Sequence, residues 1–408
     1  MRGMSQPDSI RVVVLLEGST ISGPAKNLIE FCRVLRDVKT TPRVTLSFVV
    51  FVRPSACDLR NETAPNQLIE ALESTGAEVS SIYERFPFDV RVVPQLRRVV
   101  EGFNPDIIQT HFVKSHFLVR LAGVWRTRCW IAFHHGYTKD AMRTALYNQL
   151  DRWSLREPTR IITVCQAFRK QLTTLGIPQS HICLLPNSIS SNWLSDSFDV
   201  RENGSTTQLD ESETNPKGER IVLAVGRLSR EKAFDDLVVA IHKLQVIRPK
   251  SLVRLWIVGE GPERSRIEQT ARDLNMLDRV KLIGHVRDVR PYYRRADALA
   301  ISSLSEGSPN VLLEAMAAGV PIAATAVGGI PEIVTHTKTA LMIRPGDPDA
   351  MANALDLLLS DSKLSEELAS NAQVLIRRQY SPEARSRSLL SIYQQLLPRS
   401  ISSPVLVD

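Results

Sequence analysis

The chain has 408 residues, of which 43% are hydrophobic and 23% charged, and this composition suits a folded protein of two or three domains. No apolar stretch approaches the ~20 residues needed to cross a bilayer and residues 1–9 lack the apolar run of a secretory signal, so we expect a cytoplasmic protein. Five scattered cysteines without a Cys-x-x-Cys pair argue against a disulfide framework or a zinc site, and we expect neither a metal nor a cofactor.

The formal net charge of +7 is concentrated in the first half of the chain. Residues 1–190 hold 24 Lys or Arg against 16 Asp or Glu, while the remainder is nearly balanced. Such a half could attract an anionic acceptor or an anionic membrane surface, which would place the protein peripherally on the inner face of the membrane. A solvated basic surface explains the same excess. No zinc knuckle, helix-turn-helix or aromatic RNA platform accompanies it, so we expect no nucleic-acid partner.

The first domain, residues 1–190, reads as strands alternating with helices. The β-branched run 10–16 predicts a central parallel strand, and the apolar spacing within 25–35 predicts a helix after a turn that contains Gly18 and Gly23. A strand, a glycine-containing turn and a helix form the first unit of a Rossmann-like domain, in which Gly23 would let a ligand approach the backbone. Further strands are predicted at 44–52, 105–111, 129–136, 160–165 and 182–187, and helices at 67–74 and 90–100.

Histidines stand at the ends of two of these strands, where parallel α/β sheets bind ligands. His111 ends the strand 105–111, and His134 and His135 end the next one, directly before Gly136. Residues 191–220 are predicted to be a flexible interdomain linker, because the segments 203–208 and 210–218 contain almost no apolar residues.

The second domain, residues 221–380, opens with a strand and a turn that carries cations. Arg227 offers a planar fork to phosphate oxygens and Lys232 adds a point charge, so together they could neutralise a diphosphate. A helix is predicted at 234–244 and strands at 255–258, 280–283 and 297–302. Residues 381–408 are predicted to hold a final helix.

The stretch 305–319 is predicted to be a loop followed by a helix at the same sheet edge. We expect Ser308 to be the N-cap, Pro309 the first helical residue and Gly319 the left-handed stop. The amides at the helix start favour an anion, and the carboxylates of Glu306 and Glu314 would accept hydrogen bonds from hydroxyl groups. A ligand that carries both phosphates and hydroxyl groups is a nucleotide sugar.

The run from Glu306 to Glu314 resembles the Glu-x7-Glu signature of retaining glycosyltransferases of family 4, the glycosyl transferases group 1. That family has the GT-B fold, two Rossmann-like doubly wound α/β domains that face a central cleft. The Gly-Arg and Lys of 226–232, the Gly-Glu-Gly of 259–261, the His-Gly of 135–136 and the Leu-Pro-Asn of 185–187 also match, whereas Ala233 stands where the family has glycine.

The resemblance implies roles for particular residues. It assigns catalysis to Glu306, His135, Arg227 and Lys232, with His134 as the fallback for His135. The predicted donor-binding residues are Gly23, Gly226, Arg227, Lys232, Val286, Glu306, Gly307, Ser308, Pro309, Asn310, Val311 and Glu314.

The implied activity is metal-independent, retaining transfer of a hexosyl group from a nucleotide-diphosphate sugar. The acceptor would be a glycan, a lipid-linked sugar or a polysaccharide precursor. The resemblance makes 1–190 the acceptor-side domain and 221–380 the domain that binds the nucleotide sugar, and the helix within 381–408 would return to the first domain. Two alternatives stay open. One is another GT-B enzyme, a phosphorylase or a nucleotide-sugar epimerase, and the other is a non-catalytic nucleotide-sugar-binding scaffold of polysaccharide assembly.

Overall fold

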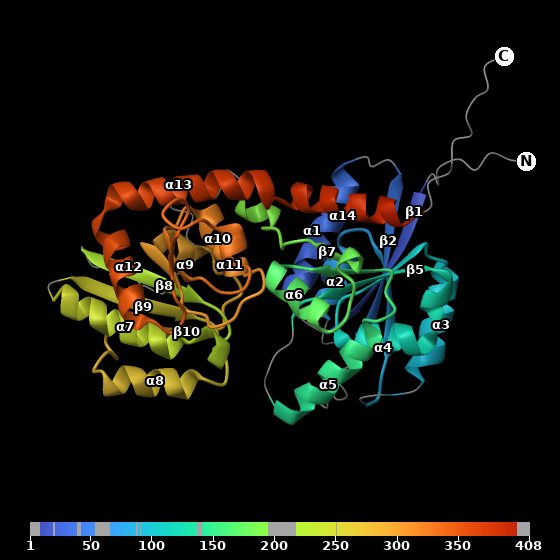
Figure 1. The fold of residues 1–408 in the computed structure, drawn as a ribbon, viewed down its shortest axis with the longest axis horizontal. Helices are drawn as coiled ribbons and strands as arrows, with labels where there is room; N and C mark the ends of the chain where they lie inside the picture. The colour runs from blue at the N-terminus through green and yellow to red at the C-terminus, as the bar shows by residue number, and fades with distance from the viewer. Residues whose placement is uncertain are drawn as a thin grey trace, which may run out of the picture. The chain divides into compact units, whose positions relative to one another are not determined.

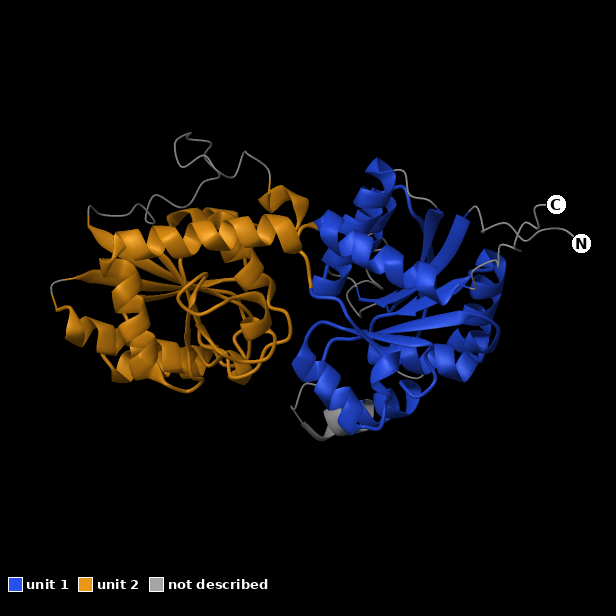
Figure 2. Cartoon of the chain, turned by 45° about the horizontal axis from the view of Figure 1, so that its top comes forward, with its two compact units in different colours: residues 1–186, 382–408 blue, residues 187–381 orange. Residues whose placement is uncertain are grey.

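The structure, a computed structural model, forms two compact units that are each built on one parallel sheet. Unit 1 comprises Met1–Pro186 and Pro382–Asp408, and unit 2 comprises Asn187–Ser381 (Figure 2). The described residues are 9–18, 21–38, 42–53, 66–86, 89, 91–136, 141–194, 218–249 and 251–397. Two doubly wound α/β domains are the fold class that the sequence predicts.

Unit 1 contains a seven-stranded sheet with the order β3-β2-β1-β4-β5-β6-β7. The central strand β1 is a continuous apolar run from Val12 to Leu16 because helices cover both faces of the sheet (Figure 1). The edge strand β3 is more polar than β1, and the sequence does not predict it. The strands are β1 (Ser9–Glu17), β2 (Arg43–Val52), β3 (Glu78–Tyr83), β4 (Ile107–Thr110), β5 (Cys129–His134), β6 (Arg160–Thr163) and β7 (Ile182–Leu184).

The C-terminal helix of the chain belongs to unit 1, where it packs on the first helix. The rings of Phe31 and Tyr393 meet edge to face at 6.1 Å, and the Tyr393 hydroxyl donates to Gln109 Oε1 at 2.6 Å. The helices of this unit are α1 (Gly23–Asp37), α2 (Gln67–Glu73), α3 (Val92–Phe103), α4 (Val113–Ala122), α5 (Ala141–Ser154), α6 (Gln166–Thr174) and α14 (Pro382–Leu396). Within the described ranges, no helix combines the length and the apolar composition needed to cross a membrane.

Unit 2 contains a six-stranded sheet with the order β10-β9-β8-β11-β12-β13. Its strands are β8 (Glu219–Val225), β9 (Leu252–Val258), β10 (Val280–Gly284), β11 (Ala298–Ile301), β12 (Ile322–Thr325) and β13 (Leu341–Ile343). Its helices are α7 (Phe234–Ile247), α8 (Arg264–Asp273), α9 (Arg290–Arg295), α10 (Asn310–Ala318), α11 (Ile330–Ile333), α12 (Pro348–Ser360) and α13 (Ser362–Gln379).

The strand orders of both sheets reverse direction next to the first strand of each unit. In unit 1 the reversal lies between β1 and β4, and in unit 2 it lies between β8 and β11. The connections that leave these strand pairs run to opposite faces, so a crevice opens at their carboxyl ends. In unit 2 this point brings together the turn after β8 and the loop after β11.

The predicted linker 191–220 differs from the structure at both ends. Ser191–Trp193 form a 3-10 turn, and the buried Trp193 packs edge to face on Tyr293 with 5.1 Å between ring centroids. At the other end β8 already begins at Glu219. Residues 191–193 are ordered, and do not belong to a flexible linker, because the Trp193 side chain buries apolar surface in unit 2. Residues 195–217 of the predicted linker lie outside the described residues.

Ala233, the residue that departs from the family pattern, has a left-handed backbone. Its φ of 48° and ψ of 46° end the 3-10 turn Arg230–Lys232 and precede α7. An L-residue other than glycine pays a steric cost in this conformation, because its Cβ crowds the following carbonyl. The turn therefore keeps the geometry that glycine would give, at some cost in stability.

We expect Ala233→Gly to raise the unfolding free energy of unit 2 by up to about 1 kcal/mol, because relief of steric strain outweighs the added entropy of the unfolded chain. The matched control is Ala240→Gly, since Ala240 is as buried as Ala233 but lies inside α7. That control should lower the unfolding free energy by about 1 kcal/mol. Urea unfolding of the full chain measures the unfolding free energy of both variants. An equal loss of stability in the two would contradict the interpretation that the backbone of Ala233 is strained.

Candidate functional site

Lys232 and Glu306 form an ion pair that joins the turn after β8 to the loop after β11. Lys232 Nζ lies 2.6 Å from Glu306 Oε1, and the same oxygen accepts a hydrogen bond from the Ser303 hydroxyl at 2.6 Å. The Glu306 side chain is only 9% exposed. A carboxylate this shielded needs such partners, so its position is fixed before any ligand binds.

Backbone contacts hold the same two loops together. The Leu304 amide donates to the Glu231 carbonyl at 2.7 Å, and the Ser302 hydroxyl donates to the Lys232 carbonyl at 2.8 Å. These bonds lie at the reversal of strand order between β8 and β11, where the fold opens its crevice.

Gly328 and Gly329 support the Glu306 loop from the side of β12. A Cβ atom on Gly328 would lie 1.7 Å from the Glu306 carbonyl oxygen, and the Gly329 amide donates to the Gly307 carbonyl at 2.9 Å. Thr325 adds a hydrogen bond of 2.6 Å to the Ser303 carbonyl. The close approach needs glycine at position 328, whose φ of 56° also favours it.

Helix α10 begins one residue later than predicted, so the placement of its N-cap at Ser308 and of its first residue at Pro309 is wrong. Its N-cap is Pro309, which has an extended ψ of 120°, and Asn310 is the first helical residue. The Ser308 hydroxyl is instead engaged by Asn187, whose amide N–H donates to it at 3.2 Å. The side-chain amide of Asn187 also donates to the Ser308 carbonyl at 2.8 Å and to Asn310 Oδ1 at 3.2 Å. Gly319, with a φ of 66°, ends the helix as predicted.

Glu314 lies on the buried side of α10, where it is 8% exposed. Its Oε2 accepts a hydrogen bond from the Tyr293 hydroxyl at 3.0 Å. Burial, and then the neighbouring Glu314 charge, raise the pKa of Tyr293 well above its ordinary value, so this tyrosine stays a hydrogen-bond donor. The hydrogen bond from Tyr293 therefore holds the Glu314 carboxylate in one orientation.

Arg227 is the exposed cation of this edge. Its side chain makes no hydrogen bond or ion pair with any residue that the structure describes. The turn that carries it packs tightly on the next one, since a Cβ on Gly259 would lie 1.9 Å from the Gly226 carbonyl oxygen and a Cβ on Gly261 would lie 2.3 Å from that of Leu228. Glycine at both positions therefore keeps the Arg227 turn close to β9.

The remaining predicted donor-binding residues of unit 2 lie around these loops. Val286 follows β10 and packs against the core of the unit, and Val311 is in the first turn of α10. Gly226, Gly307, Ser308, Pro309 and Asn310 complete the set. The structure brings all of the predicted residues of unit 2 to the carboxyl side of one sheet, with cations, helix-start amides and two fixed carboxylates. Such a surface can bind an anion and hydroxyl groups together.

In unit 1, His135 and His134 differ in their partners. His134 Nδ1 lies 3.5 Å from Asp151 Oδ2, and the other oxygen of that carboxylate lies 2.7 Å from His116 Nδ1. Nε2 of His135 is shielded from solvent and has no hydrogen-bond partner among the described residues. His134 Nε2 is shielded and without a partner among these residues in the same way, so this feature does not separate the two rings. The contact of His134 Nδ1 with Asp151 does separate them, because it holds the buried His134 ring in place, whereas His135 is partly exposed.

His135 and His111 are held in the neutral form by burial, which lowers the pKa of each. Burial lowers the pKa of His135 to about 3, and the charges of His134, His116 and Arg385 act in the same direction. Burial also lowers the pKa of His111 well below its ordinary value. A neutral imidazole can both donate and accept a hydrogen bond, so it can bind a hydroxyl group without adding charge. Gly23, also predicted to approach the donor, is the first residue of α1.

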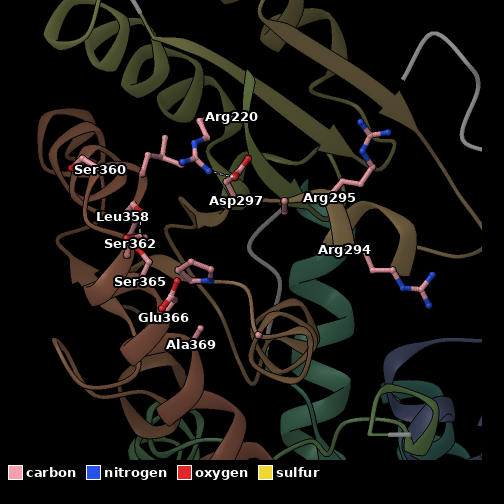
Figure 3. Close-up of a pocket in the computed structure, with 14 residues that line it drawn as sticks. Arg220, Arg294, Arg295, Asp297, Leu358, Ser360, Ser362, Ser365, Glu366 and Ala369 are labelled. Atoms are coloured by element: carbon pink, nitrogen blue, oxygen red, sulfur yellow. Dashed lines mark hydrogen bonds and ion pairs between the residues drawn. The ribbon is translucent and has the colours of Figure 1, made fainter. Parts of the chain in front are cut away.

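A hollow of about 720 Å³ lies elsewhere in unit 2, near the start of β8, β11 and β12 (Figure 3). Arg220 donates to Asp297 across it at 2.7 Å, while Arg294 and Arg295 point away from Glu366 (Figure 3). It is at the amino ends of the strands and does not include any predicted site residue. No group of three or more potential metal ligands occurs in the part of the chain that the structure describes.

Several residues that hold the site residues in place are not predicted from the sequence. Ser303, Asn187, Tyr293 and Gly328 fix Glu306, Ser308 and Glu314, yet none was assigned a role. The signal for Gly328 in the sequence is the Gly-Gly pair 328–329, which follows β12 after two residues, because such a pair indicates a close backbone approach. The contacts of Asn187 and Tyr293 join residues far apart in sequence, whereas Ser303 lies in the same loop as Glu306, three residues before it.

Two family models match the chain. Residues 205–374 match the model of Glycosyl transferases group 1, and residues 50–188 match that of the Glycosyl transferase 4-like domain. N-acetyl-alpha-D-glucosaminyl L-malate synthase of Bacillus anthracis is 25% identical over 320 residues, or 78% of this chain and 80% of the relative. The lipopolysaccharide core biosynthesis glycosyltransferase LpsE of Rhizobium meliloti is 31% identical over 182 residues, or 45% of this chain and 51% of the relative.

Solved structures share the fold. Anabaena HepE in complex with UDP superposes with a TM-score of 0.75 and 19% identity, covering 95% of this chain and 100% of HepE. Sucrose-phosphate synthase from Thermosynechococcus elongatus gives a TM-score of 0.73 at 19% identity, covering 95% of this chain and 99% of the synthase.

We expect Gly328→Ala to lower the unfolding free energy of unit 2 by about 1–3 kcal/mol more than a matched glycine substitution, because the new methyl group collides with the Glu306 carbonyl. The control is Gly346→Ala. Gly346 has a similar φ of 68° and no atom within 4 Å of its would-be Cβ, so it reports the left-handed strain alone. Urea unfolding of the full chain compares the two. Equal losses would show that the Glu306 loop is not braced at position 328.

Proposed function

The chain belongs to the glycosyl transferases group 1 and has the GT-B fold, and on that premise we propose that it transfers a hexosyl group from a nucleotide-diphosphate sugar to a glycan, lipid-linked or polysaccharide-precursor acceptor with retention of configuration. HepE, which shares the fold, has been crystallised with UDP and with UDP-glucose. LpsE acts in lipopolysaccharide core biosynthesis according to its name. Both support a nucleotide-sugar donor and a glycan acceptor.

The ion pair between Lys232 and Glu306 is the observation on which the donor site rests. It places a cation and a carboxylate 2.6 Å apart beside the start of α10. We assign the diphosphate to Lys232, the exposed Arg227 and the first amides of α10, and the sugar hydroxyl groups to Glu306. On this assignment a diphosphate would share the Lys232 ammonium with Glu306.

The transfer step needs positive charge where the bond breaks. As the bond between the sugar C1 and the diphosphate oxygen lengthens, negative charge grows on the phosphate and the sugar becomes oxocarbenium-like. Arg227, Lys232 and the α10 amides would stabilise that charge in place of a metal ion, and they are held in position before the reaction. The acceptor hydroxyl oxygen then bonds to C1 from the face that the diphosphate leaves, and its proton passes to the departing phosphate oxygen, so the configuration is retained.

Two further residues would orient the donor. Glu314, held by Tyr293, would accept hydrogen bonds from the ribose hydroxyl groups, and the backbone around Val286 would contact the base. In unit 1 the neutral His135 would bind a hydroxyl group of the transferred sugar through its unpartnered Nε2. Contact with an anionic membrane surface stays a prediction from the charge of residues 1–190.

We expect Lys232→Met to weaken nucleoside-diphosphate binding by about tenfold or more, because a charge-assisted hydrogen bond is lost and Glu306 is left facing the phosphate. The matched control is Lys243→Met. Lys243 Nζ also lies 2.6 Å from a carboxylate oxygen, that of Asp349, but this pair is exposed and outside the site. Lys232→Arg retains the positive charge and should lose less affinity for the nucleoside diphosphate than Lys232→Met.

Thermal unfolding of the full chain with UDP, GDP, ADP and CMP measures these effects. At about 100 times its dissociation constant a ligand adds roughly 2.7 kcal/mol of stability. One nucleotide should stabilise the wild type and Lys243→Met, and stabilise Lys232→Met less. The donor site is wrong if no nucleotide stabilises the wild type, or if both methionine variants respond alike. Free phosphate as a co-substrate, or product formation without an acceptor, would favour a phosphorylase or an epimerase.

A further inference from the structure

A chain of buried hydrogen bonds connects the C-terminal helix α14 to the end of strand β4. The Tyr393 hydroxyl of α14 lies 2.6 Å from Gln109 Oε1, and Gln109 Nε2 lies 2.7 Å from His111 Nε2. Gln109 and His111 are two residues apart at the end of the strand, so their side chains share one face of the sheet. All three residues are at most 2% exposed. Helix α14 is therefore in polar contact with the strand end at which the histidines lie.

The bond between Tyr393 and Gln109 has one favourable direction. Burial raises the pKa of Tyr393, so its hydroxyl keeps its proton. That proton has no other acceptor among the residues that the structure describes. A buried hydroxyl that donates to nothing loses hydrogen-bond energy. The hydroxyl therefore donates to Gln109, and the amide oxygen of Gln109 faces α14.

The bond between Gln109 and His111 fixes the proton of the imidazole. With its oxygen facing Tyr393, Gln109 offers its amide NH2 group to His111, and an NH2 group can only donate. His111 Nε2 must therefore accept and cannot carry a proton. Burial lowers the pKa of His111 well below its ordinary value, and neighbouring charges, that of His135 first, add to the effect. The neutral ring carries one proton, which is consequently on Nδ1.

The reversed orientation of the Gln109 amide satisfies fewer groups. It would place the amide NH2 on the Tyr393 oxygen and leave the Tyr393 proton without an acceptor. His111 would then donate from Nε2, and its Nδ1 would still have no partner among the described residues. The hydrogen-bond chain therefore selects the orientation in which Nδ1 of His111 holds the proton.

The protonated Nδ1 of His111 is available to a ligand. It is shielded from solvent and has no hydrogen-bond partner in the part of the chain that the structure describes. A shielded N–H without a partner is unfavourable, and a ligand oxygen that accepts its proton restores the missing hydrogen bond. The His111 ring stacks beside the His135 ring, with 5.8 Å between their centroids and 16° between their planes. The donor thus lies next to the histidine assigned to the transferred sugar.

We propose that Tyr393 is a positioning residue of the transferase. Through Gln109 it holds His111 in the tautomer with the proton on Nδ1, so that an oxygen atom of the transferred sugar meets a fixed hydrogen-bond donor beside His135. The inference rests on the proposed glycosyl transfer and adds the residues of α14 and β4 that prepare unit 1 for the sugar. Tyr393 acts through another residue, because Gln109 lies between it and His111.

The tautomer decides which ligand group fits at this point. With the proton on Nδ1, His111 needs an oxygen lone pair, which a hydroxyl group supplies and a deoxy position does not. The opposite tautomer would need the proton of that hydroxyl group instead. A free imidazole exchanges between the two forms, so a residue that fixes one of them removes a competing arrangement of the bound sugar.

The test of the tautomer is long-range proton–nitrogen correlation NMR on the full chain with isotope-labelled histidine. His111→Gln identifies the His111 signals by their loss. We expect a protonated Nδ1 and an unprotonated Nε2 in the wild type. Tyr393→Phe removes a single oxygen atom, so the Gln109 amide can reverse and Nδ1 should lose its proton in part of the molecules. Gln109→Met removes the donor to Nε2 and should have the same effect.

The matched control is Tyr380→Phe. Tyr380 is also buried, and its hydroxyl donates to the Glu332 carbonyl of unit 2 at 3.4 Å. The same single oxygen atom is removed, but no hydrogen bond to a histidine depends on it. The His111 signals should therefore stay as they are in the wild type.

Thermal stabilisation measures the sugar contact separately from nucleotide binding. UDP-glucose, ADP-glucose and GDP-mannose are each compared with the free nucleoside diphosphate, and the difference reports the contribution of the sugar. We expect Tyr393→Phe to keep the nucleotide shift of the wild type and to weaken the sugar contribution by about threefold to tenfold, since one hydrogen bond from a buried donor is lost. Tyr380→Phe should keep both.

Three results would overturn the positioning role. They are an unprotonated Nδ1 of His111 in the wild type, identical His111 signals in Tyr393→Phe and Tyr380→Phe, and a full sugar contribution in Tyr393→Phe. Loss of the nucleotide shift in Tyr393→Phe would also overturn it, because the substitution would then act on the fold as a whole. Absence of a nucleotide shift in the wild type would instead count against the glycosyl transfer, and the NMR result does not depend on it.

Discussion

The ion pair between Lys232 and Glu306 is the contact on which the site of unit 2 depends. It joins the loops that leave β8 and β11, and the fold brings these loops together because the strand order reverses between those two strands. Ser303 completes the carboxylate's partners, and the close approach of Gly328 keeps the backbone of Glu306 in place. Pairing also neutralises both groups when no ligand is bound, so Arg227, which is exposed, remains charged and available to a diphosphate.

The two units differ in how they present charge. Unit 2 gathers cations and helix-start amides at one edge, which suits a diphosphate. In unit 1 burial lowers the pKa of His135 and of His111 and keeps both rings neutral, which suits hydroxyl groups.

The sequence predicted most of the fold because buried parallel strands are continuous apolar runs, as in β1, and because glycine marks the ends of elements, as at Gly319. It missed β3, an edge strand with too few apolar residues to stand out, and it extended the linker over Trp193, whose burial depends on Tyr293, 100 residues further along the chain. The site residues of unit 2 could be proposed because their motif is local. The start of α10 was misplaced, since the Ser308 side chain bonds to Asn187 and no rule of local capping contains that contact.

A crystal structure of the full chain with UDP, or with the nucleotide that stabilises it, tests the central claim most directly. The account predicts phosphate oxygens within hydrogen-bond distance of Lys232 Nζ and of the first amides of α10, with the Arg227 side chain turned toward them and Glu314 at the ribose. A nucleotide bound at the amino ends of the strands, in the hollow beside Arg220, or one that leaves the Lys232–Glu306 pair without a phosphate neighbour, would contradict it.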